Sequence, residues 1–340
     1  MRRTFPFPAW LVCSVLGVAC FFIAGCRSSQ EANVALTCVS MNLAFPDAMA
    51  VVERIDGTER LSLVQISAGR RRIVEKAWMF MGVAWSGDGN SLWACPVPEP
   101  QSASWQLIRY DRKGEPLLKI RAHGRPEVVR PSASGSVLLI QATDFADASA
   151  LDEPVLVRLD VPSGSETVVA RRAWLSWVGH PWLNEHEVIY VQEDKALASV
   201  YHLVRLDVSS GRAAKRFSGP IGYVALSPDA RRFAAVLRRQ RAGELVVGTV
   251  SGEAVARVVA AGISAAVWVT PSVLVVCTDA GDLKSLNPDS GKSTHLLHLG
   301  RKTQQVDYVP GLEVVWAWPD RVEAADLTTR QRRVLYSVEP

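Results

Sequence analysis

Residues 224–259, VALSPDARRFAAVLRRQRAGELVVGTVSGEAVARVV, decide the fold of this chain. Their apolar runs at 224–226, 233–237, 245–250 and 254–259 are each as short as a strand, and turn sequences separate them. In the first turn, Pro228 fixes the backbone φ angle and Asp229 caps its own backbone. This stretch therefore predicts four short antiparallel strands that follow one another in the chain.

The same unit recurs seven times along the sequence, and each copy begins with a short triplet. The third positions of successive triplets are 40, 45, 47, 49, 42 and 40 residues apart, which is the period of a four-stranded propeller blade. The triplets are Leu43-Ala44-Phe45, Val83-Ala84-Trp85, Val128-Val129-Arg130, Leu175-Ser176-Trp177, Val224-Ala225-Leu226, Ala266-Val267-Trp268 and Val306-Asp307-Tyr308. We therefore predict an all-β fold, a seven-bladed β-propeller of four-stranded antiparallel blades.

The residue types in these triplets suit the innermost strand of a blade. The third position is aromatic in five of the seven triplets, and the middle position is mostly Ala or Ser. Because alternate residues of a strand face opposite ways, a bulky side and a small side let neighbouring wedge-shaped blades pack closely. We expect Trp85, Trp177 and Trp268 to be buried between blades, and the first strand to contain residues 43–45.

Two turns carry a resemblance to a known family. Ser227-Pro228-Asp229-Ala230 and Ser86-Gly87-Asp88-Gly89 match the Ser-Pro-Asp-Gly turn of WD40-like propellers of the Tol-system type. The resemblance covers about residues 36–338 as a degenerate repeat, and it implies the propeller fold. The propeller lipoprotein of the outer-membrane barrel-assembly machinery is a more distant likeness, since that family has eight blades.

The N-terminus has the layout of an export signal, with Arg2 and Arg3 before an apolar run at 9–24. Ile23-Ala24-Gly25-Cys26 resembles a bacterial lipobox, which implies diacylglycerol and fatty-acid acylation (such as palmitate) at Cys26 after cleavage before it. The alternative is an uncleaved anchor helix, but the run is short for a bilayer of about 30 Å. Arg27, where Asp would favour the inner membrane, points to the periplasmic side of the outer membrane if the cell is Gram-negative.

These features divide the chain into a lipoprotein signal peptide at 1–25, a lipidated Cys and short tether at 26–35, and one propeller domain at 36–340. The tether spans at most about 30 Å when extended, so the propeller is expected to stay near its membrane. Residues 34–39 could supply an extra strand that helps to close the ring.

Composition excludes some classes of function. The formal charge is only +4 and no Lys or Arg stripe is present, so we expect no nucleic-acid partner. Three cysteines follow Cys26, and their spacing fits neither a metal site nor a disulfide scaffold. We expect Cys38, Cys95 and Cys277 to be mainly buried thiols, with one disulfide as the alternative.

Candidate binding residues lie on the loops between the second and third strands, which are long in blades two to five and share one face. Irregular loops on a rigid scaffold are where binding usually occurs. Charged residues of opposite sign lie there, and Arg130 stands in the triplet column, where it points into the channel or pairs with a carboxylate. The candidate binding face comprises Arg130, Asp144, Asp147, Glu193, Arg238, Arg239 and Arg241.

The sequence carries no hydrolase or metalloprotease motif, and we expect no cofactor or metal. His180 and His186 lie in the first-to-second turn of blade four, while His295 and His298 should face opposite sides of one strand. The sequence therefore favours a lipid-anchored envelope module that binds a partner protein. A propeller hydrolase or oxidoreductase with its site at the channel mouth, and a purely structural envelope protein, stay open as alternatives.

Overall fold

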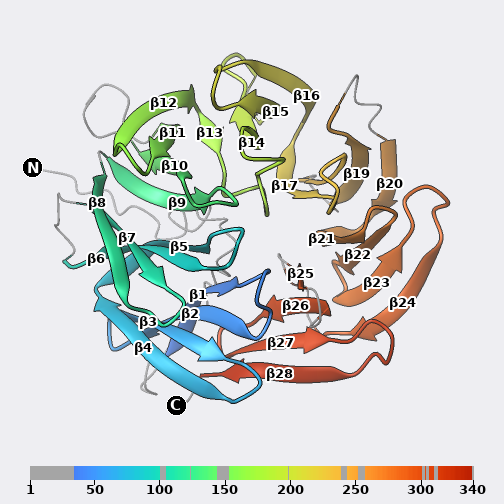
Figure 1. Ribbon diagram of the computed structural model, residues 1–340. Coiled ribbons are helices and arrows are strands. Elements are labelled where there is room, and N and C mark those ends of the chain that lie inside the picture. Colours follow the sequence, from blue (N-terminus) through green and yellow to red (C-terminus); the bar gives the residue numbers. More distant parts are fainter. Residues whose placement is uncertain are drawn as a thin grey trace, which may run out of the picture.

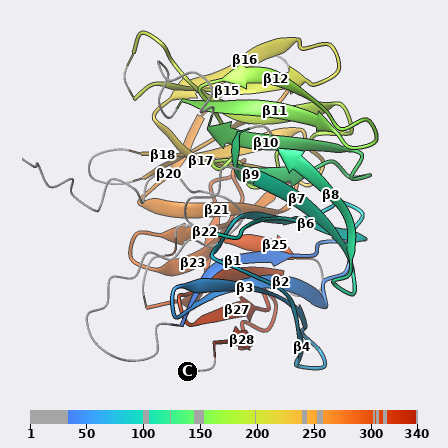
Figure 2. The same cartoon turned by 90° about the vertical axis from the view of Figure 1, so that its left-hand side faces the viewer.

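The computed structural model describes residues 34–338 except 100–104, 123, 144–152, 198, 239–242, 252–256, 301–302, 304–305 and 310–312. In this part of the chain, 28 strands form seven four-stranded antiparallel sheets, and there is no helix. The sheets stand around a ring as blades (Figure 1), and Figure 2 shows the ring from its edge. The predicted seven-bladed propeller is therefore confirmed.

Each blade is built from four strands that follow one another in the chain. Blade one contains β1 (Ala35–Met41), β2 (Ala48–Ile55), β3 (Thr58–Gln65) and β4 (Arg70–Ala77). Blade two contains β5 (Met79–Trp85), β6 (Ser91–Val97), β7 (Trp105–Asp111) and β8 (Pro116–Ala122). Blade three contains β9 (Arg125–Pro131), β10 (Val137–Thr143), β11 (Pro154–Asp160) and β12 (Ser165–Arg171). Blade four contains β13 (Ala173–Trp174), β14 (Glu187–Glu193), β15 (Tyr201–Asp207) and β16 (Ala213–Gly219).

The remaining blades follow the same order. Blade five contains β17 (Ile221–Leu226), β18 (Arg232–Leu237), β19 (Glu244–Thr249) and β20 (Arg257–Ala261). Blade six contains β21 (Ile263–Thr270), β22 (Val273–Thr278), β23 (Asp282–Leu286) and β24 (Ser293–His298). Blade seven contains β25 (Asp307–Val309), β26 (Glu313–Ala317), β27 (Arg321–Ala325) and β28 (Arg332–Ser337). No helical segment of the described residues has the length and apolar character needed to span a bilayer.

Burial follows the position of each strand in its blade. β2 is buried continuously from Met49 to Glu53, because a middle strand has a neighbouring blade on each side. β4 lies at the outer edge and is mostly exposed or half-buried. Trp85, Trp177 and Trp268 are buried as expected, and the Trp85 indole N–H donates to the Ser40 carbonyl of blade one at 3.2 Å. The aromatic column therefore lies between blades.

The buried cysteines agree in part with the expectation from sequence. Cys38, Cys95 and Cys277 are all buried. Cys95 and Cys277 are free thiols as expected, whereas Cys38 is disulfide-bonded, which is the alternative to a buried thiol. Burial raises the pKa of Cys95 to about 12, so this thiol stays protonated and unreactive.

A register shift recurs in the pairing of the third strand with the fourth, and all seven described blades have one. Such a bulge adds one residue to a strand and increases its twist. It also interrupts the strict alternation of side chains, so residues three apart across the bulge face the same side. This feature was not expected from the sequence.

The predicted first strand of blade one is wrong. Residues 35–41 form its innermost strand, β1, and Leu43-Ala44-Phe45 lies in the following turn. Asn42 ends the strand, because its Oδ1 accepts the Phe45 N–H at 3.0 Å and its Nδ2 donates to the Gly89 carbonyl of blade two at 2.9 Å. Residues 34–39 are therefore part of the regular blade and add no extra strand to the ring.

The innermost strand of blade four also differs from the prediction. Its ladder covers only Ala173 and Trp174, and Leu175-Ser176-Trp177 leaves the sheet. Val178 instead pairs in parallel with Val224 of blade five, and the ladder of blade four resumes at Trp182 and Val188. A Cβ on Gly179 would lie 2.5 Å from the Tyr223 hydroxyl, so glycine permits this close approach. The segment 175–181 therefore lies on the inner side of blade five.

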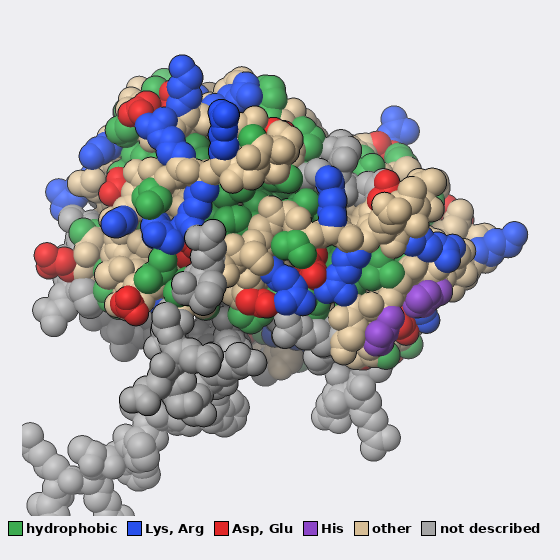
Figure 3. Space-filling view, turned by 90° about the horizontal axis from the view of Figure 1, so that it is seen from below, with side chains coloured by type: hydrophobic (Ala, Val, Ile, Leu, Met, Phe, Trp, Pro, Cys, Tyr) green, Lys and Arg blue, Asp and Glu red, His purple; other side chains and the backbone are tan. Residues whose placement is uncertain are grey.

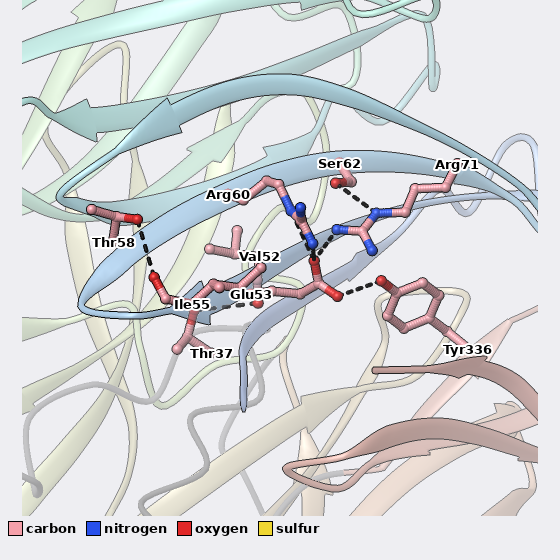
Figure 4. A network of polar contacts seen from close by, with 9 residues as sticks. All are labelled: Thr37, Val52, Glu53, Ile55, Thr58, Arg60, Ser62, Arg71 and Tyr336. Carbon is pink, nitrogen blue, oxygen red and sulfur yellow. Dashed lines mark hydrogen bonds and ion pairs between the residues drawn. The ribbon is translucent and has the colours of Figure 1, made fainter. Parts of the chain in front are cut away.

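Among the described strands, blades one and seven each contain only consecutive strands of the chain, so the ring closes by contact between these two blades. A buried carboxylate, Glu53 of β2, joins them (Figure 4). Tyr336 of β28 donates to Glu53 Oε1 at 2.5 Å, while Arg60 and Arg71 bind Oε2. The Leu36 amide also donates to the Pro319 carbonyl at 2.8 Å. Buried charges need such partners, so this network specifies the contact between the first and last blades.

Candidate functional site

The two faces of the ring differ in their connections. We call the side with the second-to-third loops and the blade crossovers the loop face, and the opposite side the turn face. The second-to-third connections of blades two to five run from 98 to 104, 144 to 153, 194 to 200 and 238 to 243, whereas that of blade one is the two residues between β2 and β3. The predicted concentration of long loops on one face is confirmed.

Of the predicted binding residues, three lie in the described part of the chain. Glu193 ends β14 and Arg238 follows β18, so both lie on the loop face. Arg130 lies on β9, an innermost strand. Asp144, Asp147, Arg239 and Arg241 lie outside the described residues, as does the lipidation residue Cys26.

Three aromatic rings lie between Glu193 and Arg238 in blades four and five, and we call this set of five residues the aromatic rim. Trp174 and Trp177 stack with their ring centroids 5.2 Å apart, and Tyr201 meets Trp177 edge-on at 4.7 Å. Burial raises the pKa of Tyr201, the Glu193 carboxylate raises it further, and the Arg238 guanidinium lowers it. The pKa of Tyr201 therefore responds to both Glu193 and Arg238, two of the predicted binding residues.

The Arg238 side chain is held by packing. Its guanidinium carbon lies 5.1 Å from the centroid of the Trp177 ring, a cation–π arrangement. A Cβ on Gly222 would lie only 2.7 Å from Arg238 Cγ, so the missing side chain leaves the path open. Arg238 is exposed, and no described residue accepts a hydrogen bond from its guanidinium. The geometry presents an oriented cation with free donors on the loop face.

The loop next to the rim is also ordered by a carboxylate. Asp194 Oδ1 accepts the amides of Ala196 and Leu197 at 2.7 and 3.1 Å, and Oδ2 lies 2.7 Å from His202 Nε2. The Ala196 amide and then His202 lower the pKa of Asp194 to about 2. Leu197 at the loop tip is 58% exposed, so an apolar side chain stands beside the rim.

A second group of polar side chains converges on the axis of the ring. Arg130 of β9, His180 of the segment 175–181, Tyr223 of β17 and Asp307 of β25 come from blades three, four, five and seven, and we call them the axial cluster. The protonation of Arg130, His180 and Tyr223 is in each case influenced by at least one other member, and Asp307 acts on all three. Figure 1 shows β9, β17 and β25 as inner strands around the centre. His180 is the exposed member of the cluster, whereas Arg130 and Asp307 are buried.

Arg130 is the most unusual member of the axial cluster. Its side chain is 6% exposed, and its one hydrogen bond runs from Nη1 to its own neighbour's carbonyl, on Val129, at 3.3 Å. The other two guanidinium nitrogens, Nε and Nη2, are buried and have no hydrogen-bond partner among the described residues. Leaving a buried donor unpaired costs about 1–3 kcal/mol, and more for a charged group. The Arg130 site is therefore costly to maintain without a partner.

Burial dominates the protonation of the axial cluster. It lowers the pKa of Arg130 to about 10, although Tyr223 and Asp307 counteract it, so Arg130 stays charged at neutral pH. It raises the pKa of Tyr223, with Asp307 adding to the effect. Desolvation by surrounding protein atoms lowers the pKa of His180 although the residue is exposed; Asp307 opposes this effect and Arg130 adds to it. A neutral imidazole and a neutral phenol thus lie near one guanidinium.

The histidines are placed differently from the prediction. His180 belongs to the axial cluster, whereas His186 lies apart, 3.4 Å from the Ser209 hydroxyl. His295 and His298 face the same side, because the bulge in β23–β24 pairing changes the alternation. Their ring nitrogens lie 3.6 and 2.8 Å from Asp282 Oδ1. Figure 3 shows histidine side chains side by side, on a surface where Lys and Arg are interspersed with Asp and Glu. No group of metal-ligating residues occurs among the described residues.

Most of the axial cluster was missed by sequence reasoning. Arg130 stands out in the sequence because most other triplets have an aromatic residue at its position. Tyr223 precedes its triplet and Asp307 is the middle residue of another, so neither stands out. One signal in the sequence could have pointed to His180. The fourth and fifth triplets are 49 residues apart, the longest spacing, and this extra length gives blade four room for the segment 175–181.

No family model matches this chain, and no curated protein matches it. Solved structures, in contrast, match this chain in fold. An uncharacterized protein from Listeria monocytogenes is 10% identical, with a TM-score of 0.63 over 91% of this chain and 96% of that chain. The β-propeller domain of Cps50 (Swd1) from Myceliophteria thermophila is 14% identical, with a TM-score of 0.55 over 93% and 99%.

A TolB protein from Acinetobacter baumannii is 14% identical, with a TM-score of 0.47 over 83% of this chain and 67% of that chain. At these identities, the similarity of the Listeria and Cps50 structures shows the propeller fold and nothing about partners or substrates.

Proposed function

We propose that this chain is a lipid-anchored β-propeller of the cell envelope that binds a partner protein on its loop face. The proposed anchor rests on the lipobox-like Ile23-Ala24-Gly25-Cys26 after an apolar run. Arg27 supports the periplasmic side of the outer membrane in a Gram-negative cell. A short tether would then hold the ring within about 30 Å of its membrane.

One observation carries the binding proposal, the stacked and exposed Arg238 of the aromatic rim. The Trp177 ring fixes the guanidinium, so little side-chain entropy is lost when it binds a partner. Its free donors match the two oxygens of a carboxylate. Tyr201 meets the Trp177 ring, and the exposed Leu197 lies in the loop that follows Glu193, so both offer apolar surface near the rim. Aromatic and Arg side chains are the types enriched at the energetic centres of protein interfaces.

The proposed partner is a protein that presents a carboxylate, with apolar side chains next to it. Arg238 would steer and orient the acidic group, and the half-buried Trp174 and Tyr201 would be covered further on docking, whereas Trp177 is already buried. Glu193 at the other end of the rim disfavours a uniformly acidic surface. The partner segment is therefore expected to be amphipathic and to carry few charges.

The test begins with capture of the lipidated chain from envelope fractions and identification of its partner. The purified partner is then bound to wild type, Arg238→Glu and Arg231→Glu by a surface-based kinetic assay at several salt concentrations. We expect Arg238→Glu to slow association and to weaken its salt dependence, because a steering charge is reversed. Equal binding by wild type and Arg238→Glu would show that the partner does not dock on the loop face at Arg238.

Arg231→Glu is the matched control. Arg231 is exposed and follows the Ser227–Ala230 turn on the turn face. Its neighbour Arg232 is unsuitable, because its guanidinium binds Asp289 at 3.0 and 2.9 Å and lies 5.0 Å from the centroid of Trp268. Reversing the charge at Arg232 would disturb the contact between blades five and six.

The axial cluster favours a second candidate function, a hydrolase or oxidoreductase with its site at the channel mouth. The observation is the convergence of His180, Tyr223, Asp307 and Arg130 from four blades, since active sites bring together ionisable groups with shifted pKa values. A turnover assay with ester, lactone and alcohol substrates on wild type and His180→Ala tests it. Activity that His180→Ala abolishes supports the enzyme, and its absence across all three substrate classes counts against it.

A further inference from the structure

We propose that the axial cluster binds a small monocarboxylate, held by the Nε–Nη2 edge of Arg130. This inference is independent of partner docking on the loop face, because Arg130, Tyr223 and Asp307 lie on inner strands of the ring and His180 lies in the segment 175–181. It assigns a ligand to the site and does not require that the ligand be transformed.

The first step of the argument concerns the guanidinium. Nε and Nη2 form one edge of the planar group, with two parallel N–H donors, and this is the edge that binds a carboxylate through two hydrogen bonds. Both nitrogens are buried and lack a partner. Other described arginines, such as Arg109, Arg125 and Arg158, leave only Nε in this state. Arg130 alone among them keeps a complete two-donor edge unused.

The second step concerns the charge around that edge. Arg130 stays protonated at neutral pH, so an anion is the partner that its edge favours. Asp307 acts on Arg130, Tyr223 and His180 as a negative charge. Because Asp307 offsets the charge of Arg130, a dianion such as hydrogen phosphate gains little extra net attraction there and costs more to desolvate than a monoanion. The electrostatics therefore favour a single carboxylate over phosphate.

The third step concerns the neighbours of the ligand. Tyr223 keeps its proton and offers an O–H donor, and His180 is mostly neutral. His180 is the exposed member of the cluster, so a ligand would enter on its side. His180 lies in the segment 175–181, where the strand pairing of blade four is interrupted and the chain runs along blade five. The extra segment thus forms one wall of the proposed site.

The experiment titrates the full-length mature chain with acetate, butyrate and benzoate, and separately with inorganic phosphate. The readout is the indole N–H signal of Trp182, whose Nε1 donates to the Arg130 carbonyl at 3.2 Å, together with calorimetry. The signal is assigned with Trp182→Phe. We expect saturable binding of at least one carboxylate and weaker binding of phosphate.

Arg130→Lys keeps the charge but removes the two-donor edge, and it should weaken carboxylate binding by about tenfold or more. Arg121→Lys, the same change on an exposed outer strand, should bind like wild type. If Arg130→Lys does not fold, Tyr223→Phe replaces it and should weaken binding severalfold through loss of one donor. Failure of all three carboxylates to bind wild type, stronger binding of phosphate, or undiminished binding by the folded axial variant overturns the proposal.

Discussion

Trp268 tests the packing of the ring. Its side chain is 2% exposed, and it packs in a cluster with Ala234, Val247 and Leu274 from blades five and six. The Trp268→Ala variant removes most of an aromatic surface of about 150–250 Å², which at about 25 cal/mol per Å² corresponds to about 4–6 kcal/mol. Large-to-small changes of this kind in cores cost about 3–5 kcal/mol when measured.

Two features of the site adjust this magnitude in opposite directions. The Trp268 indole Nε1 is buried without a hydrogen-bond partner, so its removal relieves a penalty of about 1–3 kcal/mol. The stacking of Arg232 on the ring is lost, which costs about 0.5–1 kcal/mol. The expected loss in free energy of unfolding is therefore about 3–4 kcal/mol. Trp268→Phe keeps most of the surface and removes the unpaired N–H, so it should lose clearly less.

The assay is equilibrium unfolding in urea, followed by far-ultraviolet circular dichroism, with the slope m compared between variants. Trp105→Ala is the control, because Trp105 is only half-buried at the start of β7. It should lose less stability than Trp268→Ala. Equal losses for the two variants, or a loss below about 1.5 kcal/mol for Trp268→Ala, would refute the assignment of the aromatic column to a core between blades.

Two further predictions concern the anchor and the loop next to the rim. Cys26→Ala should abolish labelling with radioactive fatty acid and block processing at this site; unchanged labelling and fractionation would disprove the lipoprotein assignment. Asp194→Asn should lower stability at neutral pH, because the depressed pKa of Asp194 stabilises the fold above the ordinary value of 3.8. That contribution is lost as pH falls toward about 2, so the difference in urea midpoint between wild type and Asp194→Asn should shrink between pH 3.8 and about 2, and a constant difference would contradict it.

The regular parts of the fold could be predicted from the sequence because their signals are local and repeated. Turns such as Ser227–Ala230 close on themselves, with the Ser227 hydroxyl donating to Asp229 at 2.6 Å and accepting the Arg232 amide at 2.9 Å. A period of 40–49 residues then fixes the number of blades. The first strand of blade one was predicted too late in the chain, because residues 43–45 have the same pattern as the triplets of other blades. In the structure, β1 ends at Met41 and Asn42 begins the turn.

The site could be predicted only in part. Arg238 and Glu193 were found because charges in long loops stand out, but the Trp177 ring that orients Arg238 was assigned to the regular column. The ring lies outside that column because the pairing of β13 with β14 ends at Trp174 and the following residues leave the sheet. The axial cluster depends on residues from four blades, so no spacing in the sequence brings them together. The bulge that aligns His295 with His298 likewise has no signal in the residues themselves.

The most direct test of the central claim, that the loop face docks a partner protein, is site-specific photo-crosslinking in intact cells. A photoreactive amino acid replaces Leu197 beside the aromatic rim, or Leu117 on the outer strand β8, which are 58% and 57% exposed and so are matched in accessibility. The account predicts one dominant protein adduct from position 197, lost in an Arg238→Glu background, and none from position 117. An adduct to the same protein from position 117 alone, or from 197 regardless of Arg238→Glu, would contradict it.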